Sequence, residues 1–359
     1  MSEFYSVISG TGSYIPNRRI KNEDFLKNEF YNTDGTKLDK DNEEVINKFF
    51  EITTIAERRY VDDDQSVSDI AFYAAEKAIE AAGIDKEELD YIIVAHNFGE
   101  VKKGDNQVDI IPSLAARVKS KLEIDNPYTV AYDLPFGCPG WLQALIQANY
   151  YIKSGDAKKV LVIGAEVLSR VIDPHDRDSM IYADGAGATV LESRESDTHV
   201  GVLAHSTRSD TKIYSEMLFM GKSYNQDVPS DKTYLKMHGR KLYQYALRYV
   251  PQAIKSCLEK SNTDIRDVKK VLIHQANGKM DDAILQRLFK LYGIDELPEG
   301  VMPMTIDWLG NSSVATIPTL LDLILRDDFK SQHINSGDVI VFASVGAGMN
   351  INAVVYRMV

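Results

Sequence analysis

A cysteine, a histidine and an asparagine, each at a turn between predicted elements, are the residues of this sequence best suited to chemistry. Cys138 lies in the stretch Asp133-Leu-Pro-Phe-Gly-Cys-Pro-Gly-Trp141, between a β-branched segment and an apolar helical one. Pro139 suits the first position inside a helix, so Cys138 is predicted as its N-cap. A helix N-terminus lowers a cysteine pKa and favours thiolate, which would make Cys138 a nucleophile. The alternative is a buried cysteine that only fills space.

His274 and Asn311 occupy comparable positions later in the chain. His274 ends the apolar strand segment 270–274, and ligands bind at that end of the strands in doubly wound sheets. Asn311 opens a turn ahead of an apolar helix. Taken singly, such a histidine is more often structural, and such an asparagine more often a turn residue or N-cap. Together with Cys138 they form a much more specific set.

Two glycine-containing stretches could have similar roles. Gly346-Ala-Gly348 follows the predicted strand 339–343 and is either a tight turn or a backbone N–H donor to an oxyanion. The stretch 182–190, Tyr-Ala-Asp-Gly-Ala-Gly-Ala-Thr-Val, does not have the glycine spacing of a nucleotide-binding loop. We therefore interpret it as close packing.

Strands and helices alternate along both halves of the chain. Asp85 and Asp264 open matching connectors, and Ser-Gly-Asp precedes a strand at both 154–156 and 336–338. We infer a duplicated unit with sheets covered on both faces, which would bring the turns at Cys138 and Asn311 together. The alternative is two unrelated α/β segments. The predicted strands are 5–16, 91–95, 128–132, 160–165, 270–274 and 339–343, and the predicted helices are 67–82, 112–122, 141–152, 245–260 and 319–325.

The composition is that of an ordinary soluble protein. The 359 residues are 44% hydrophobic and 26% charged, enough for one or two domains. The start of the sequence has no signal-peptide pattern and no apolar run is long enough to span a bilayer, so a cytoplasmic protein without membrane contact is expected. Two cysteines, Cys138 and Cys257, fit a reducing compartment. The net charge of −12 argues against nucleic acid as a partner.

The surroundings of these residues resemble a known family. The carrying segments are Gly-Cys-Pro-Gly at 137–140, His-Gln-Ala-Asn at 274–277, Gly-Asn-Ser-Ser at 310–313 and Asp-Gly-Ala-Gly-Ala at 184–188. They resemble the β-ketoacyl-acyl carrier protein synthase III family of thiolase-like condensing enzymes over most of the chain. The resemblance implies a five-layered α/β/α/β/α fold built from two duplicated halves, usually a homodimer. Residues 1–200 would carry the cysteine and residues 201–359 the histidine and asparagine.

The chemistry that the resemblance implies is a decarboxylative Claisen condensation that initiates fatty acid biosynthesis, with no metal and no cofactor. Cys138 would take an acyl group from an acyl-CoA or acyl carrier protein primer. His274 and Asn311 would donate hydrogen bonds to the thioester oxygen of malonyl-acyl carrier protein as carbon dioxide leaves. The oxyanion at the acyl-cysteine would lie near the N–H groups of Cys138 and Ala347.

The residues expected to contact substrates follow from the same resemblance. Phe136 and Trp141 flank the nucleophile and either line the primer pocket, beside Gly346 and Gly348, or belong to the core. Lys279 and Arg287 stand where the family places cations for the carrier protein, with Arg240 nearby, and the alternative is a solvated helix face. These charges lie in the second predicted half.

One departure concerns the grip on coenzyme A. Lys48 and Ile52 stand where similar enzymes carry a Trp and an Arg that hold the adenine end of coenzyme A. A long polar excursion, from about residue 21 to residue 47, precedes this segment and is expected to end in a short helix. Whether the primer arrives on coenzyme A is therefore open.

Three alternative functions remain at this point. The first is a related condensing enzyme of specialised, polyketide-like metabolism with an unusual starter. The second is a Cys-His-Asn thioester hydrolase, in which the histidine accepts the thiol proton and water reaches the acyl-enzyme. The third is a catalytically silent carrier-binding subunit, which ranks lowest because Cys138, His274 and Asn311 are all present.

Overall fold

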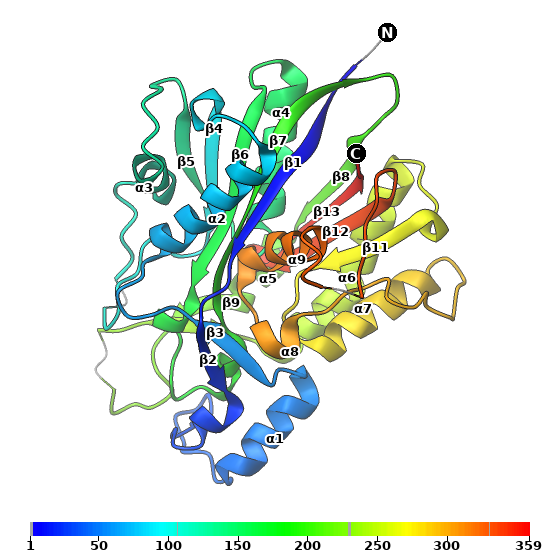
Figure 1. Cartoon of the computed structure of the whole chain (residues 1–359). Coiled ribbons are helices and arrows are strands. Elements are labelled where there is room, and N and C mark those ends of the chain that lie inside the picture. The colour runs from blue at the N-terminus through cyan, green and yellow to red at the C-terminus, as the bar shows by residue number, and fades with distance from the viewer. Residues whose placement is uncertain (1–2, 106, 229–230, 330) are drawn as a thin grey trace.

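Two β-sheets form the framework of this computed structural model, which describes residues 3–105, 107–228, 231–329 and 331–359 (Figure 1). In the first sheet the strands follow the order β1-β7-β6-β4-β5, and in the second the order β11-β12-β13-β8. The first sheet contains β1 (Glu3–Tyr14), β4 (Tyr91–His96), β5 (Val130–Pro135), β6 (Lys159–Val167) and β7 (Asp184–Ser196). The second contains β8 (Gly201–Ser209), β11 (Val268–Ile273), β12 (Val339–Gly346) and β13 (Asn350–Arg357).

The two sheets have related topologies. In the first, β4, β5 and β6 are parallel while β7 is antiparallel to both β6 and β1. In the second, β11 and β12 are parallel while β13 is antiparallel to both β12 and β8. The orders therefore correspond strand for strand, except that β5 has no counterpart among the described strands of the second sheet. A boundary at residue 200 between two halves stays a prediction.

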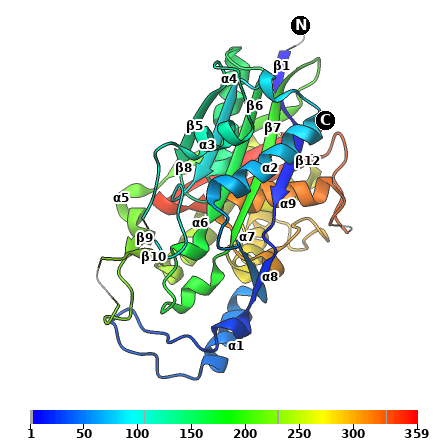
Figure 2. The same ribbon diagram turned by 60° about the vertical axis from the view of Figure 1, so that its left-hand side comes forward.

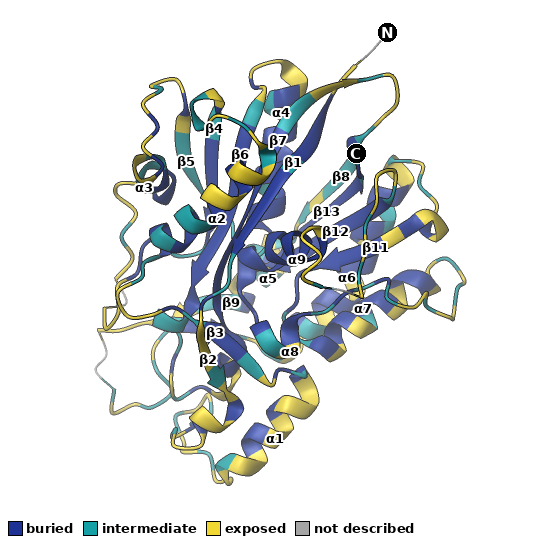
Figure 3. Cartoon of the chain, viewed as in Figure 1, coloured by how far each residue is buried: buried dark blue, intermediate teal, exposed yellow. Residues whose placement is uncertain are grey.

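Helices cover both faces of each sheet and fill the space between them. One outer layer packs on the first sheet, a middle layer lies between the sheets, and another outer layer packs on the second sheet. The five layers alternate helix and strand, as expected, and the central elements are buried (Figure 3). The layers are α2 (Val67–Ala82) with α3 (Leu114–Lys121), α4 (Gly140–Ser154) with α9 (Thr316–Leu325), and α6 (Gly239–Lys260) with α7 (Gly278–Lys290).

Local sequence explains where several elements begin and end. Helix α2 starts after Ser66, whose side chain caps the Asp69 N–H, and stops at Gly83 in a left-handed conformation (φ 65°). Asp85 and Asp264 each cap a short 3-10 helix by accepting a hydrogen bond from the N–H two residues on. The matching connectors read from the sequence are therefore confirmed as matching caps.

The remaining elements lie around one end of the sheets. Helix α1 (Asn42–Thr53) ends the polar excursion and lies at the lower end of the molecule in both views (Figures 1 and 2). Within the described chain, no helix combines the length and apolar character that crossing a bilayer requires. The other short elements are β2 (Arg18–Lys21), β3 (Glu57–Tyr60), α5 (Thr211–Tyr214), β9 (Leu218–Gly221), β10 (Tyr234–Met237) and α8 (Ile306–Leu309).

Candidate active site

The nucleophile turn, residues 137–140, joins β5 to α4. Its bend is at Gly137, whose φ of 77° lies in the left-handed region that glycine adopts without strain. The N–H of Gly140 donates to the carbonyl of Gly137 at 2.8 Å, which encloses Cys138 in the turn. Helix α4 begins at Gly140 with Pro139 as its N-cap, one residue later than predicted. The reason is that the closed turn keeps both Cys138 and Pro139 out of the helix.

The thiol of Cys138 is partly buried and lies against the second half of the chain. Ser313 donates its hydroxyl hydrogen to the sulfur, with Oγ and Sγ 3.2 Å apart. Burial raises the pKa of Cys138 to about 11, and the Ser313 hydrogen bond acts in the opposite direction without offsetting it. The expected lowering of this pKa by the helix start is therefore wrong for the resting site. Because the resting group is a thiol, its proton must leave when the sulfur attacks.

His274 follows β11 at the carboxyl end of that strand. Its backbone N–H donates to the carbonyl of Ala343 at 2.9 Å, and its ring is buried. Burial lowers the pKa of His274 to about 4, although the backbone of Ser313 favours the protonated form. The ring is therefore neutral at pH 7 and keeps one N–H donor. Its Nδ1 is buried and has no hydrogen-bond partner among the described residues.

Asn311 is held by backbone hydrogen bonds on both sides. Its N–H donates to the carbonyl of Ile181 at 2.9 Å, and its carbonyl accepts from the N–H of Ala183 at 2.8 Å. Its side-chain Oδ1 accepts from the N–H of Ser313 at 2.8 Å. This contact fixes the amide so that Nδ2, a donor group, is left for another acceptor.

Ser313 is the common neighbour of the three predicted residues. Its hydroxyl contacts Cys138, its N–H contacts Asn311, and its backbone influences the ring of His274. The structure thus brings the nucleophile of the first sheet's turn to the donors of the second sheet, as the duplication predicted. Ser313 itself has φ 53°, an uncommon value for a residue with a side chain.

The backbone groups expected to bind an oxyanion lie close together. A Cβ added to Gly346 would be 2.7 Å from the backbone nitrogen of Cys138. A Cβ added to Gly137 would be 3.1 Å from the backbone nitrogen of Ala347. The nucleophile turn therefore packs directly against residues 346–347, and the absence of a Cβ at Gly137 and Gly346 allows this close approach. Whether both N–H groups bind an oxyanion stays a prediction.

A cavity of about 180 Å³ opens beside Cys138. Trp141 is not part of it, because the indole packs edge-on against Phe342 between the two sheets, with ring centroids 5.7 Å apart. The expectation that Trp141 lines the primer pocket is therefore wrong, because its ring belongs to the core between the two sheets. Of the described residues that line the cavity, none is Phe136, Gly346 or Gly348, although Ala347 is. The lining is apolar at Phe98, Leu168, Leu218, Phe219, Met220, Leu235 and Ala347, and polar at Asn97, Tyr182 and Ser313.

Comparison with known proteins agrees with this geometry. The family model of 3-oxoacyl-[acyl-carrier-protein] synthase III matches residues 132–211, and that of its C-terminal domain matches residues 258–358. Beta-ketoacyl-[acyl-carrier-protein] synthase III 1 of Vibrio parahaemolyticus is 34% identical over 350 residues, 96% of each chain. The chain belongs to the synthase III family. It is therefore an acyltransferase-type condensing enzyme with a thiolase-like fold.

Solved structures extend the comparison. The synthase III of Aquifex aeolicus superposes with a TM-score of 0.80 at 30% identity, covering 98% of this chain and 99% of that one. The priming β-ketosynthase of the R1128 polyketide pathway superposes with a TM-score of 0.80 at 26% identity, covering 100% of this chain and 98% of that one. The described residues of this synthase III contain no group of three or more side chains arranged to hold a metal ion.

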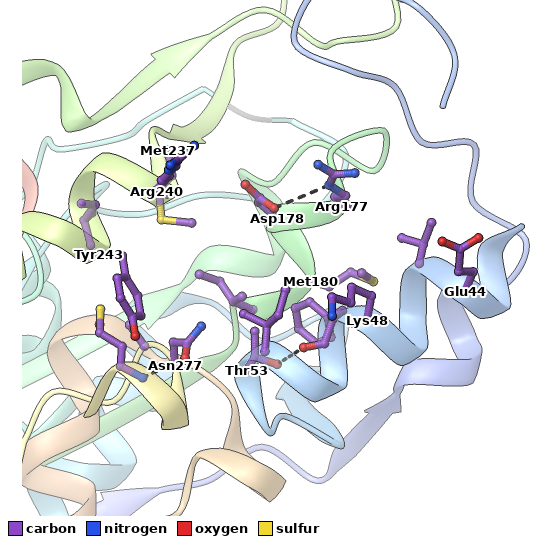
Figure 4. A pocket seen from close by; sticks show the side chains of 18 of the residues that line it. Glu44, Lys48, Thr53, Arg177, Asp178, Met180, Met237, Arg240, Tyr243 and Asn277 are labelled. Atoms are coloured by element: carbon purple, nitrogen blue, oxygen red, sulfur yellow. Dashed lines mark hydrogen bonds and ion pairs between the residues drawn. The ribbon is translucent and has the colours of Figure 1, made fainter. Parts of the chain in front are cut away.

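A second cavity, of about 450 Å³, lies next to the active site of this synthase III (Figure 4). Successive residues line the two cavities, Ile181 this one and Tyr182 the cavity beside Cys138. Lys48 and Ile52 both line it, although Lys48 is paired with Glu51 at 2.8 Å and its side chain is 66% exposed. We call this cavity the mouth. Four cations line it: Lys40, Lys48, Arg177 and Arg240.

The three cations expected to bind a carrier protein are all exposed, and each has different neighbours. Lys279 lies near Glu51 of α1, whose pKa it helps to lower. Arg287 instead donates to the carbonyl of Leu247 in α6 at 3.4 Å. Eight residues of helix turn by about 80° beyond two full turns, which gives Lys279 and Arg287 different neighbours along α7. Arg240 lines the mouth and forms no ion pair with any described residue.

Sequence reasoning missed part of the site. Asn97 and Phe98 follow β4, and Glu166 lies near the end of β6, so both segments reach the edge of the sheet where Cys138 follows β5. The carboxyl ends of parallel strands meet at one edge, which is the signal that could have identified them. The sequence predicts Tyr182 only as part of the closely packed stretch 182–190. Its hydroxyl is buried without a partner among the described residues, and burial keeps its pKa well above the usual value.

Proposed function

We propose that this synthase III condenses an acyl primer with malonyl-acyl carrier protein through an acyl-Cys138 intermediate, initiating fatty acid biosynthesis. The observation that carries the proposal is Ser313, whose hydroxyl lies 3.2 Å from the Cys138 sulfur and whose backbone contacts both Asn311 and His274. A nucleophile linked through one residue to two uncharged donor side chains suits acyl transfer followed by enolate formation.

In the first half-reaction, the sulfur of Cys138 attacks the primer thioester carbonyl. A new C–S bond forms, the old C–S bond breaks, and the leaving thiol takes up the proton that the cysteine lost. The backbone N–H groups of Cys138 and Ala347 would hold the oxyanion, since they lie together across Gly346. The acyl chain would occupy the mostly apolar cavity of about 180 Å³.

In the second half-reaction, malonyl thioester loses carbon dioxide. The electron pair of the broken C–C bond moves onto the thioester carbonyl as an enolate, and His274 and the Asn311 Nδ2 donate to its oxygen. Donors in a dry site stabilise developing charge far more than they would in water. The enolate carbon then attacks the acyl-Cys138 carbonyl, the C–S bond to Cys138 breaks, and its electron pair returns to the sulfur. A proton from solvent restores the thiol, and a 3-oxoacyl thioester leaves on the carrier protein.

Substrates would arrive through the mouth. Arg240 is exposed and without an ion-pair partner among the described residues, so it suits the phosphate of a phosphopantetheine arm. Lys279 and Arg287 would contribute to steering the acidic carrier protein over a chain whose own net charge is −12. Lys48 and Ile52 stand where similar enzymes carry the Trp and Arg that hold the adenine end of coenzyme A. Their presence favours a primer carried by acyl carrier protein over one carried by coenzyme A.

The second candidate is a priming enzyme of specialised metabolism. It is supported by the R1128 priming ketosynthase, which superposes as closely as the Aquifex enzyme although at lower identity. The two candidates share the chemistry at Cys138 and differ in the primer. A thioester hydrolase would share only the acylation step.

The deciding experiment measures carbon dioxide release from malonyl-acyl carrier protein with a panel of acyl-CoA and acyl carrier primers. We expect release that depends on primer, a 3-oxoacyl product, and a primer adduct on Cys138 by mass spectrometry. An adduct on Cys257, which is fully buried, would contradict the proposal. Free acid without carbon dioxide would identify a hydrolase, and activity only with unusual starters would favour specialised metabolism.

We also propose a homodimer in the cytoplasm. Strand β5 is an edge strand, and its first residue Val130 is 49% exposed, while Tyr128, two residues before it, is 85% exposed. Exposed apolar edges are usually covered by another chain or element. Sedimentation would give twice the mass of the 40.3 kDa chain, and a monomer at micromolar concentration would contradict the dimer.

A further inference from the structure

A chain of hydrogen bonds links a buried carboxylate to the sulfur of Cys138. Glu166 Oε1 accepts from the backbone N–H of Asn97 and from its Nδ2, the latter at 2.8 Å. The same Nδ2 donates to Ser313 Oγ at 3.0 Å, and Ser313 Oγ lies 3.2 Å from Cys138 Sγ. Both Glu166 and Ser313 are buried. The path therefore runs from Glu166 through Asn97 and Ser313 to the nucleophile.

The chemistry of the groups gives this path a direction. An amide NH₂ has two hydrogens to donate and no acceptor, so Asn97 uses one for Glu166 and the other for Ser313. Since the Ser313 oxygen accepts from Asn97, its own hydrogen is free to point at Cys138. Burial raises the pKa of Glu166 to about 7, and above that pH its carboxylate holds Asn97 in this orientation, because the reversed amide would place oxygen against oxygen.

The backbone also fixes Ser313 in place. Its φ of 53° is a conformation that costs free energy for a residue with a side chain, and such conformations persist mainly at functional sites. The side chain of Asn311 accepts the Ser313 N–H at 2.8 Å and stabilises this backbone. The hydroxyl is thereby directed toward the sulfur rather than left to rotate in a loop.

We propose that Ser313 is a catalytic residue that donates a hydrogen bond to the Cys138 sulfur as it becomes a thiolate, and that Glu166 is a positioning residue that holds Ser313 through Asn97. The proposal rests on the proposed function for the role of Cys138 as nucleophile. The serine keeps its own proton throughout. It stabilises the sulfur when the thiol proton departs during acylation, and again when the C–S electron pair returns to sulfur during condensation.

The surroundings make such a donor necessary. Burial disfavours a charged sulfur, and the Glu166 charge disfavours it further, whereas the Ser313 hydrogen bond is the side-chain contact that favours it. Tyr182 also faces Cys138, and its buried phenol remains protonated. His274 is neutral and supplies no positive charge. A single well-directed hydroxyl therefore carries much of the stabilisation of the thiolate.

The test is the rate at which iodoacetamide alkylates Cys138 between pH 7 and 10, which needs no substrate. Ser313→Ala should lower this rate roughly 10- to 100-fold below pH 9, because a hydrogen bond to a charged group is lost. Ser312→Ala is the matched control, since the neighbouring hydroxyl lies 3.4 Å from Thr316 Oγ1 and should leave the rate within twofold. Ser313→Gly removes the same hydroxyl and suits φ 53°, so it replaces the alanine variant if that one misfolds.

Two Glu166 variants test the positioning role. Glu166→Met keeps the side-chain length without an acceptor and should slow alkylation nearly as much as Ser313→Ala. Glu166→Gln keeps an acceptor oxygen for Asn97 and should restore most of the rate, which a merely structural role would not produce. Equal alkylation in Ser313→Ala, Ser313→Gly and wild type at every pH would overturn the proposal. Unchanged alkylation in Glu166→Met would overturn the positioning role. If wild-type Cys138 is alkylated but no primer acylates it, the proposed function fails and the hydrogen-bond series still stands.

Discussion

Replacing Gly346 by alanine tests how closely the nucleophile turn must be held. Gly346 ends β12 with an extended backbone (φ −165°, ψ −162°) that alanine also adopts, so the substitution is a test of space alone. The added Cβ would lie 2.7 Å from the Cys138 nitrogen and 2.8 Å from the Cys138 Cβ. Favourable separations begin at about 3.5 Å, so the turn must move by about 0.8 Å.

The size of the effect follows from this displacement. A shift of nearly 1 Å at a reacting group costs on the order of a hundredfold in rate. Overpacking a buried site also costs about 1–3 kcal/mol of unfolding free energy. We therefore expect Gly346→Ala to slow acylation of Cys138 on the order of a hundredfold while lowering the melting temperature only modestly.

The assay is mass-spectrometric measurement of acyl-Cys138 formation against time, with thermal unfolding in parallel. Gly185→Ala is the matched control, because this buried glycine would place its Cβ in ordinary contact, 3.5 Å from the Ser312 Cβ. Its acylation rate should stay within threefold of wild type. Wild-type acylation by Gly346→Ala would refute the reasoning, as would an equal loss in Gly185→Ala.

Three further predictions concern the donors, the thiol and the carrier protein. His274→Ala should slow malonyl decarboxylation by about a hundredfold or more while Cys138 still acylates, and equal loss of both half-reactions would assign His274 to thiol activation. Asn311→Ala should slow decarboxylation as much and acylation to a smaller extent, because Asn311 also holds Ser313. Because burial raises the pKa of Cys138 to about 11, its alkylation rate should rise about tenfold per pH unit from pH 7 to 9, and a plateau near neutrality would contradict this. The double variant Lys279→Glu, Arg287→Glu should raise the KM for malonyl-acyl carrier protein without changing turnover of a small primer, and normal carrier binding at low and high salt would place docking elsewhere.

Periodicity and turn chemistry were enough to predict most of the framework. Helix α2 has the predicted bounds because a Ser66 cap and a Gly83 stop enclose an uninterrupted amphipathic pattern. The matching Asp85 and Asp264 caps revealed the duplication. Helix α6 instead begins at Gly239, before the predicted residue 245, and Leu242 continues the buried stripe of Tyr245 and Ala246 into its first turns.

The site could be predicted only at residues whose type suits catalysis and whose position in the predicted topology is clear. Cys138, His274 and Asn311 stand at strand ends or helix starts, so topology alone brings them together. The pKa of Cys138 could not be predicted, since it depends on burial by residues distant in the chain. Trp141 lies beside Cys138 in sequence, but the direction of a helical side chain depends on which layer packs against it.

Both halves of the chain line the cavity beside Cys138, which we propose holds the acyl primer, so residues of both halves would set the preference for a primer. Asn97 and Phe98 reach it from the first sheet, whereas Phe219 and Leu235 reach it from the hairpin of β9 and β10. Recombination between related genes, with its junction in the segment that connects β7 to β8, would therefore combine cavity-lining residues from two different proteins. New primer preferences should accordingly arise by paired substitutions, one in each half of the chain. Chimaeric proteins should lose their preference for a particular primer before they lose the reaction at Cys138.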